Sequence, residues 1–143
     1  MAVNYYKLPI QARDLMTNAS SKMVSLEESI INYLHLIMTT RFGECQSDAS
    51  FGCALWDVDF NNMGSNHKLR AVIADSLTKS LKRYEKRLSQ IEINVNIEQD
   101  EMDGRATVSR VKKMVLVHVI GVINKTNENF TYKAHFYIAP LSY

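Results

Sequence analysis

The sequence predicts an α+β fold in which two main helices pack on one face of a small antiparallel β-meander. Two observations predict this class. Apolar residues recur at intervals of three and four in two segments before residue 90, whereas after it they alternate with polar residues. The joins between the alternating segments are short, so we expect consecutive strands to pair antiparallel.

The first predicted helix spans about residues 26–42. Ser25 and Glu28 match a capping box, in which the serine hydroxyl caps an early backbone N–H and the glutamate reaches back to the serine. Apolar residues follow at helical spacing, and Gly43 is a typical stop. These apolar residues are Leu26, Ile30, Tyr33, Leu34, Ile37 and Met38.

Residues 43–65 are rich in Gly, Ser, Asn and Asp, which predicts an ordered loop with a short helix or turn. Its expected apolar anchors are Phe51, Leu55, Trp56, Val58 and Phe60. A second helix is predicted to begin near Asn66 or His67 and to run on toward Leu88. Its expected buried side comprises Leu69, Val72, Ile73, Leu77, Leu81, Tyr84 and Leu88. Its exposed side is basic near the C-terminal end, which suits the helix dipole.

Three strands are predicted to follow. The segment 91–98 alternates strictly, as a strand buried on one face does, and Asp103-Gly104 lies in the joint after it. The segment 114–123 is almost continuously apolar, so we expect a central strand covered on both faces, with His118 as a hydrogen-bonded core histidine. The segment 130–138 alternates again and forms the last strand.

The chain length of 143 residues is typical of one domain. Residues 1–24 lack a sustained period, so we expect an N-terminal arm or loosely ordered leader, followed by a single domain at 25–143. A net charge of +2 is too small to require a nucleic-acid partner. No apolar run approaches ~18 residues, which predicts a cytoplasmic protein without direct membrane insertion. Cys45 and Cys53 are expected to be reduced thiols.

The sequence shows no catalytic signature, and we expect neither an enzyme nor a bound metal or cofactor. Its four histidines lack the spacing of a metal site, and no nucleotide-binding motif is present. Glycoside hydrolysis needs two carboxylates held ~5–10 Å apart. Several pairs remain open on sequence grounds, drawn from Glu27, Glu28, Glu44, Asp48, Asp57, Asp59 and Glu85. Capping explains the first two, and acidic residues are common in loops such as the one that holds Asp57 and Asp59.

Three short motifs stand in a recognisable order. The segment Thr39-Thr40-Arg41-Phe42-Gly43-Glu44 looks like an "L-x-T-x-x-G-E" passage, with Ile37 or Met38 in place of Leu. Phe51-Gly52 resembles an aromatic–glycine pair, and Tyr84-Glu85-Lys86-Arg87 falls where a Glu-Pro-Arg motif is expected, with Lys86 in place of Pro. In these motifs, over about residues 25–138, the chain resembles the GPW-type (lysozyme-like) baseplate wedge family of contractile injection machines. The type VI secretion member of that family is called TssE.

The resemblance implies a structural, sheath-subunit-like protein, present in multiple copies in a cytoplasmic, membrane-docked baseplate. It implies baseplate wedge proteins and contractile sheath subunits as partners, and a role in starting sheath polymerisation. A peptidoglycan-hydrolysing, lysozyme-like enzyme and a phage tail baseplate subunit remain the alternatives. The family motif loop would comprise Thr39, Gly43, Glu44, Phe51 and Gly52. The wedge-docking motif would be Glu85, Lys86 and Arg87, with Lys82 and Arg83 as supporting charges.

The last predicted strand, being terminal in sequence, is our expected sheath-facing edge. Its residues are Phe130, Tyr132, Lys133, Ala134, Phe136 and Ile138. In the docking motif, Glu85 and Arg87 are two residues apart. On a continuous helix such residues point to different sides, so we expect them to make separate contacts and not to pair with each other.

Overall fold

The computed structural model describes residues 5–10, 12–17, 23–57, 66–101 and 111–138. The main body consists of helices α2 (Leu26–Thr39) and α3 (Asn66–Tyr84) and strands β3 (Leu88–Glu101), β4 (Val111–Ile123) and β5 (Glu128–Ile138). Shorter elements are β1 (Tyr5–Tyr6), α1 (Ala12–Met16), β2 (Met23–Val24) and the 3-10 helix η1 (Ala54–Trp56).

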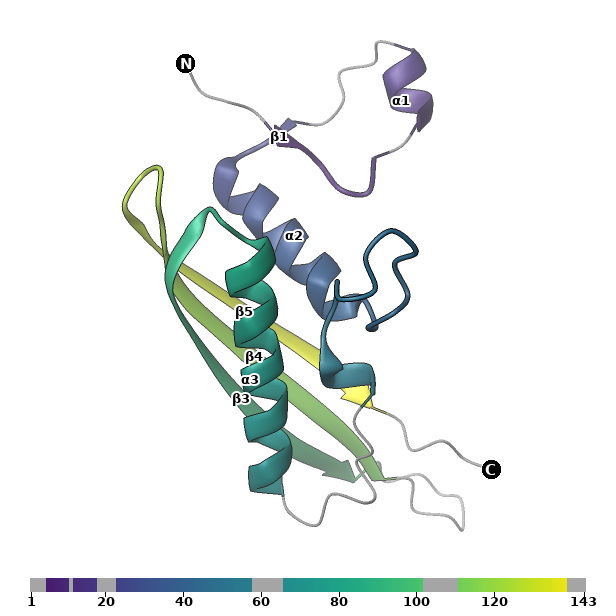
Figure 1. Cartoon of the computed structure of the whole chain (residues 1–143), viewed down its shortest axis with the longest axis vertical. Coiled ribbons are helices and arrows are strands. Elements are labelled where there is room, and N and C mark those ends of the chain that lie inside the picture. The colour runs from purple at the N-terminus through teal and green to yellow at the C-terminus, as the bar shows by residue number, and fades with distance from the viewer. Residues whose placement is uncertain (1–4, 11, 18–22, 58–65, 102–110, 139–143) are drawn as a thin grey trace.

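The three long strands form one antiparallel sheet in the order β3-β4-β5. Both long helices lie on the same face of this sheet, with α3 packed on β3 and α2 reaching β5 (Figure 1). The predicted α+β class, with two helices on one face of a meander, is confirmed. The short helix expected between the two long ones is η1.

The core fills the space between the helices and the sheet. Alternate residues of each strand point toward the helices because successive side chains of a strand face opposite ways. The sheet thus contributes Val115, Val117, Val119 and Phe130, all at most 1% exposed. The helices contribute Ile30, Leu34, Ile37, Met38, Leu69, Ile73, Leu77 and Leu81, which are equally buried. Val72, expected on the buried side of α3, is instead exposed.

Strand β4 has helices on one of its faces only. Leu116, His118 and Ile120 alternate with the buried valines, and they are half-buried on the opposite face. The prediction that β4 is covered on both faces is therefore wrong. Flanking residues of β3 and β5 supply the partial cover, as where Leu116 pairs with Asn96 and His135. The Nε2 atom of His118 finds no hydrogen-bond partner among the described residues, so the prediction of a hydrogen-bonded core histidine is also wrong.

Helix α2 begins where the sequence indicates and ends earlier. The Glu28 N–H donates to the Ser25 hydroxyl at 3.2 Å, which confirms the N-cap. The helix ends at Thr39, not near residue 42, because Thr40 adopts an extended conformation. The Thr39 hydroxyl donates to the His35 carbonyl and that of Thr40 to the Leu36 carbonyl, which satisfies groups of the last turn.

The described parts of residues 1–24 include one short antiparallel ladder. Tyr5 pairs with Val24 and Tyr6 with Met23, so this segment is tied to the residues that precede α2. The division of the chain at residue 24 stays a prediction. The expected anchors Val58 and Phe60, the carboxylate of Asp59 and the Asp103-Gly104 joint lie outside the described residues. Of the helices described, none is both long and apolar enough to cross a membrane.

Candidate docking site at the helix–strand junction

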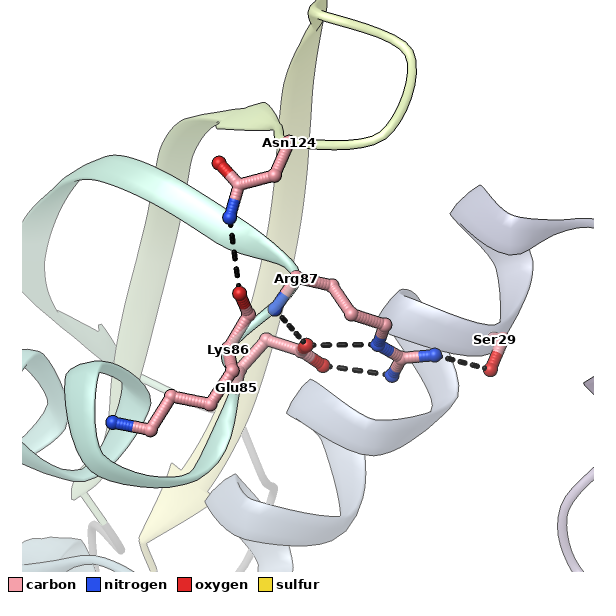
Figure 2. Close-up of polar contacts among 5 residues, drawn as sticks. All are labelled: Ser29, Glu85, Lys86, Arg87 and Asn124. Atoms are coloured by element: carbon pink, nitrogen blue, oxygen red, sulfur yellow. Dashed lines mark hydrogen bonds and ion pairs between the residues drawn. The ribbon is translucent and has the colours of Figure 1, made fainter.

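The link between α3 and β3 is the three-residue segment Glu85-Lys86-Arg87. The helix ends at Tyr84, so the prediction that it continues toward Leu88 is wrong. One of the residues that hold this link is Asn124, in the turn between β4 and β5. Its backbone N–H donates to the Arg87 carbonyl at 2.9 Å and its side-chain amide to the Lys86 carbonyl at 3.0 Å. These contacts hold the link out of the helical path (Figure 2).

Glu85 and Arg87 form a two-pronged ion pair, which we call the Glu85–Arg87 clamp. The Arg87 Nε and Nη2 atoms each lie 2.8 Å from a carboxylate oxygen of Glu85, and the Arg87 backbone N–H donates to the same carboxylate at 3.0 Å (Figure 2). The prediction that these side chains cannot pair is wrong, because the helix on which it depended has already ended. Bidentate pairs of this kind are strong and geometrically specific.

The clamp also joins the link to α2. Arg87 Nη1 donates to the Ser29 hydroxyl at 2.9 Å. Its guanidinium lies over the rings of Tyr5 and Tyr33, at 5.5 and 6.0 Å from their centroids. The Glu85 side chain is 1% exposed and that of Arg87 31%. Any direct contact with another molecule at the clamp would therefore be made through Arg87.

The electrostatics agree with this geometry. Hydrogen bonding to the Glu85 carboxylate raises the pKa of Arg87 above its usual value. Burial, followed by the Glu85 charge, raises the pKa of Tyr33. Arg87 is therefore a permanently charged side chain held between the Glu85 carboxylate and the rings of Tyr5 and Tyr33.

The remaining charges of the predicted docking motif are exposed. Lys86 points away from the clamp, and its Nζ atom donates to the Lys82 carbonyl at 3.0 Å (Figure 2). The Arg83 guanidinium lies 5.5 Å from the centroid of the Tyr84 ring. Lys82, Arg83 and Lys86 thus present positive charge to solvent beside the clamp. Their role in docking stays a prediction.

The predicted motif loop packs beside the same end of α3. Gly52 has φ +125°, and a Cβ atom there would lie 2.5 Å from the Thr40 carbonyl oxygen. The Gly52 carbonyl accepts a hydrogen bond from the Ser80 hydroxyl at 2.7 Å, and Ser76 accepts one from the Ala54 N–H at 3.0 Å. Only glycine permits this close approach of the backbone at position 52.

Aromatic rings link the motif loop to both helices. Phe51 lies between Tyr33 of α2 and Tyr84 of α3, with centroid distances of 6.1 and 5.0 Å. The Tyr84 hydroxyl donates to Asp48 at 2.7 Å, and the Ser50 hydroxyl donates to the same carboxylate at 2.6 Å. These bonds, that from Ser50 first, lower the pKa of Asp48. Phe51 of the aromatic–glycine pair thus packs against Tyr84, the residue that directly precedes the clamp.

The other motif residues have local roles. Gly43 adopts φ +83°, and its N–H donates to the Ala49 carbonyl at 2.9 Å. Glu44 accepts a hydrogen bond from the Arg41 N–H at 2.9 Å, which closes the turn that follows α2. Thr39 is the last residue of α2, and its hydroxyl donates to the His35 carbonyl, as described above. These residues build the loop, and the structure does not bring Thr39, Gly43 or Glu44 to the clamp.

Sequence reasoning missed Ser29, Ser50, Ser80 and Asn124, although each makes a hydrogen bond described above, and it named Asp48 only as a candidate carboxylate. Small polar residues are common in loops and caps, and their long-range partners depend on how the elements pack. No local signal in the sequence distinguishes them.

Strand β5 lies at one edge of the sheet and β3 at the other. Phe130 and Phe136 of β5 are buried, and Tyr132, Ala134 and Ile138 are half-buried against the core. Lys133 is exposed. Among the described strands β5 lies at an edge, and its contact with a sheath subunit stays a prediction.

Within the described residues, no group of three or more His, Cys, Asp or Glu side chains could hold a metal ion. Cys45 and Cys53 are free thiols.

Comparison with known proteins agrees with the order of the elements. Residues 24–128 match the family described as baseplate wedge protein gp25. A comparison with curated proteins found no match. A Geobacter sulfurreducens protein provisionally named a tail lysozyme shares the fold with a TM-score of 0.60 and 21% identity, over 85% of this chain and 98% of that one.

A chain of the baseplate complex from the type VI secretion system also shares the fold. Its TM-score is 0.50 and its identity 14%, over 78% of this chain and 93% of that one. Because the family match spans most of the domain, from the start of α2 into β5, it settles membership. This chain belongs to the baseplate wedge protein gp25 family.

Proposed function

We propose that this chain is a structural, TssE-like subunit of a type VI secretion baseplate. It would dock on wedge proteins through the surface around Arg87 and start polymerisation of the contractile sheath. The proposal rests on family membership and on the fold it shares with a chain of a type VI baseplate complex. The observation that carries the assembly role is the free edge of β5, eleven residues long, in a three-stranded sheet.

An edge strand presents unpaired N–H and C=O groups, and another chain can add a strand to it. Strand β5 pairs with β4 on one side, and no described strand pairs with it on the other. The helices cover its inner face, where Phe130 and Phe136 are buried. A sheath subunit that donates a strand to this edge would meet a preformed template.

Gene deletion combined with fluorescent sheath protein tests the proposal. We expect no sheath assembly in cells that lack this chain and normal assembly after complementation with the wild-type gene. Sheaths of normal number and length in the deletion strain would refute the role in starting assembly.

The docking surface needs a variant that leaves the fold intact. Lys82→Glu combined with Lys86→Glu changes two exposed charges beside the clamp, without touching Glu85 or Arg87. We expect this variant to be lost from purified baseplates, with unchanged thermal unfolding. Full incorporation of the folded variant would contradict docking at this surface.

Two alternatives are distinguished by other measurements. Mass spectrometry of proteins that co-purify with the chain separates a secretion baseplate from a phage tail baseplate, because the partners differ. A peptidoglycan zymogram tests the lysozyme-like alternative. Lysis by the wild-type protein that is lost in Glu44→Gln would support a hydrolase. The clamp argues against Glu85 as the general acid of a hydrolase, since both of its carboxylate oxygens bind Arg87.

A further inference from the structure

A groove of about 420 Å³ lies between α3 and the motif loop, and it does not use the Glu85–Arg87 clamp. Its walls include Phe42 and Ser50 on the loop side and Val72, Lys79 and Arg83 on the helix side. On α3 the intervals from Val72 to Lys79 and from Lys79 to Arg83 are seven and four residues, so these side chains share one face of the helix. The groove is open to solvent along this face.

The groove is preformed. The Ser80 hydroxyl holds the Gly52 carbonyl at 2.7 Å, and the Ala54 N–H donates to Ser76 at 3.0 Å. Ser50 and Tyr84 complete the connection, because their hydroxyls both donate to the Asp48 carboxylate, at 2.6 and 2.7 Å. A ligand would not need to order these walls, which lowers the cost of binding.

The apolar part of the groove is accessible to solvent. Phe42 is 36% and Val72 39% exposed, although both are large hydrophobic side chains. Val72 occupies a position where the helical period predicts a core contact. Phe42 and Val72 together form an apolar surface that a bulky apolar side chain of a partner can contact.

The charged part of the groove is positive. Lys79 and Arg83 line it, and Lys82 and Lys86 extend the positive charge along the end of the helix. Asp75 is the acidic lining residue and pairs with Lys79 at 2.8 Å, so these two charges offset each other and Arg83 supplies the remaining positive charge of the lining. Arg83 lies over the Tyr84 ring, and no carboxylate of the described residues forms an ion pair with it. Charge complementarity therefore favours an acidic occupant.

We propose that this groove binds an acidic segment of another protein, anchored by one bulky apolar side chain between Phe42 and Val72. The apolar anchor would supply most of the affinity, and Lys79 and Arg83 would select acidic sequences and speed association. The surface gives the chain a second contact with a neighbouring protein, separate from the clamp and from the β5 edge.

The test uses the full chain and a fluorescein-labelled probe peptide of glutamate, serine and glycine with one central phenylalanine. We expect saturable binding by fluorescence anisotropy, weakened by added salt. Lys79→Glu combined with Arg83→Glu should weaken it by about tenfold or more. Phe42→Ala should weaken it by several-fold, as should replacement of the phenylalanine in the probe by alanine.

The matched control is Arg70→Glu combined with Lys125→Glu, which changes the net charge equally at exposed positions that do not line the groove. We expect its affinity for the probe to stay within about twofold of wild type. Equal loss in both double variants would show general charge attraction and overturn the proposal, as would the absence of saturable binding to the wild-type chain. Conversion of a dimer to a monomer by Lys79→Glu with Arg83→Glu would assign the groove to a second copy, which also overturns it. The assay needs no baseplate, so its outcome is independent of the sheath experiment.

Discussion

Glu85 and Arg87, two residues apart, form a bidentate ion pair that fixes the point where α3 stops and β3 begins. Two N–H···O contacts of 2.8 Å join the side chains, and the Arg87 backbone N–H adds a third contact to the same carboxylate. Through Ser29 the pair also reaches α2. Glu85 and Arg87 therefore have a structural role within the chain, because they connect α2, the end of α3 and the start of β3. We call this connection the brace.

Removal of the arginine tests this brace. Arg87→Ala removes the cation paired with the Glu85 carboxylate, which is 1% exposed in the wild type, so we expect the free energy of unfolding to fall by ~3–5 kcal/mol. Urea denaturation monitored by circular dichroism measures the change. Lys86→Ala is the matched control, because Lys86 is exposed, and it should lie within ~0.5 kcal/mol of wild type. If Arg87→Ala were as stable as Lys86→Ala, the pair would have no structural role.

Local patterns in the sequence predict the elements of this fold and fail at their junctions. The Ser25 cap and the apolar periods locate the starts of α2 and α3 within a residue. The link after α3 is held in part by Asn124, 40 positions beyond Tyr84, and no local pattern contains that information. The apolar run of β4 led to the wrong prediction that the strand is covered on both faces, because composition alone does not show which face of a strand the helices cover.

The family's proline can be tested at position 86. Lys86 lies outside α3, and no described residue accepts a hydrogen bond from its backbone N–H. Proline there would lose only the contact of Nζ with the Lys82 carbonyl and would restrict the unfolded chain. We expect Lys86→Pro to lie within ~1 kcal/mol of wild type in urea denaturation. A loss of more than about 2 kcal/mol would mean that Glu85 needs a helical conformation, which a following proline disfavours.

The two glycines of the motif loop should respond differently to alanine. At Gly52 a Cβ atom would lie 2.5 Å from the Thr40 carbonyl oxygen, which also accepts the Cys53 N–H. The loop must shift, so we expect Gly52→Ala to cost about 3 kcal/mol of stability. Gly43 has open space around its Cα, and Gly43→Ala should cost only the left-handed strain, ~1 kcal/mol. Thermal and urea unfolding measure both variants. If Gly52→Ala and Gly43→Ala lost the same stability, this account of position 52 would be contradicted.

The two cysteines should differ in reactivity by more than their exposure alone suggests. Burial raises the pKa of Cys53 to about 11, whereas a hydrogen bond with Ser47 lowers the pKa of Cys45. The thiolate is the reactive form, so at pH 8 roughly one Cys53 in a thousand would be ionised. We expect iodoacetamide to label Cys45 quickly and Cys53 only after unfolding in urea, as read by mass spectrometry of the labelled peptides. The rate at Cys45 should rise with pH and level off below the pH at which an unperturbed thiol does. Rapid labelling of Cys53 in the folded protein would show that the motif loop opens from α3, because Cys53 lies between Gly52 and η1.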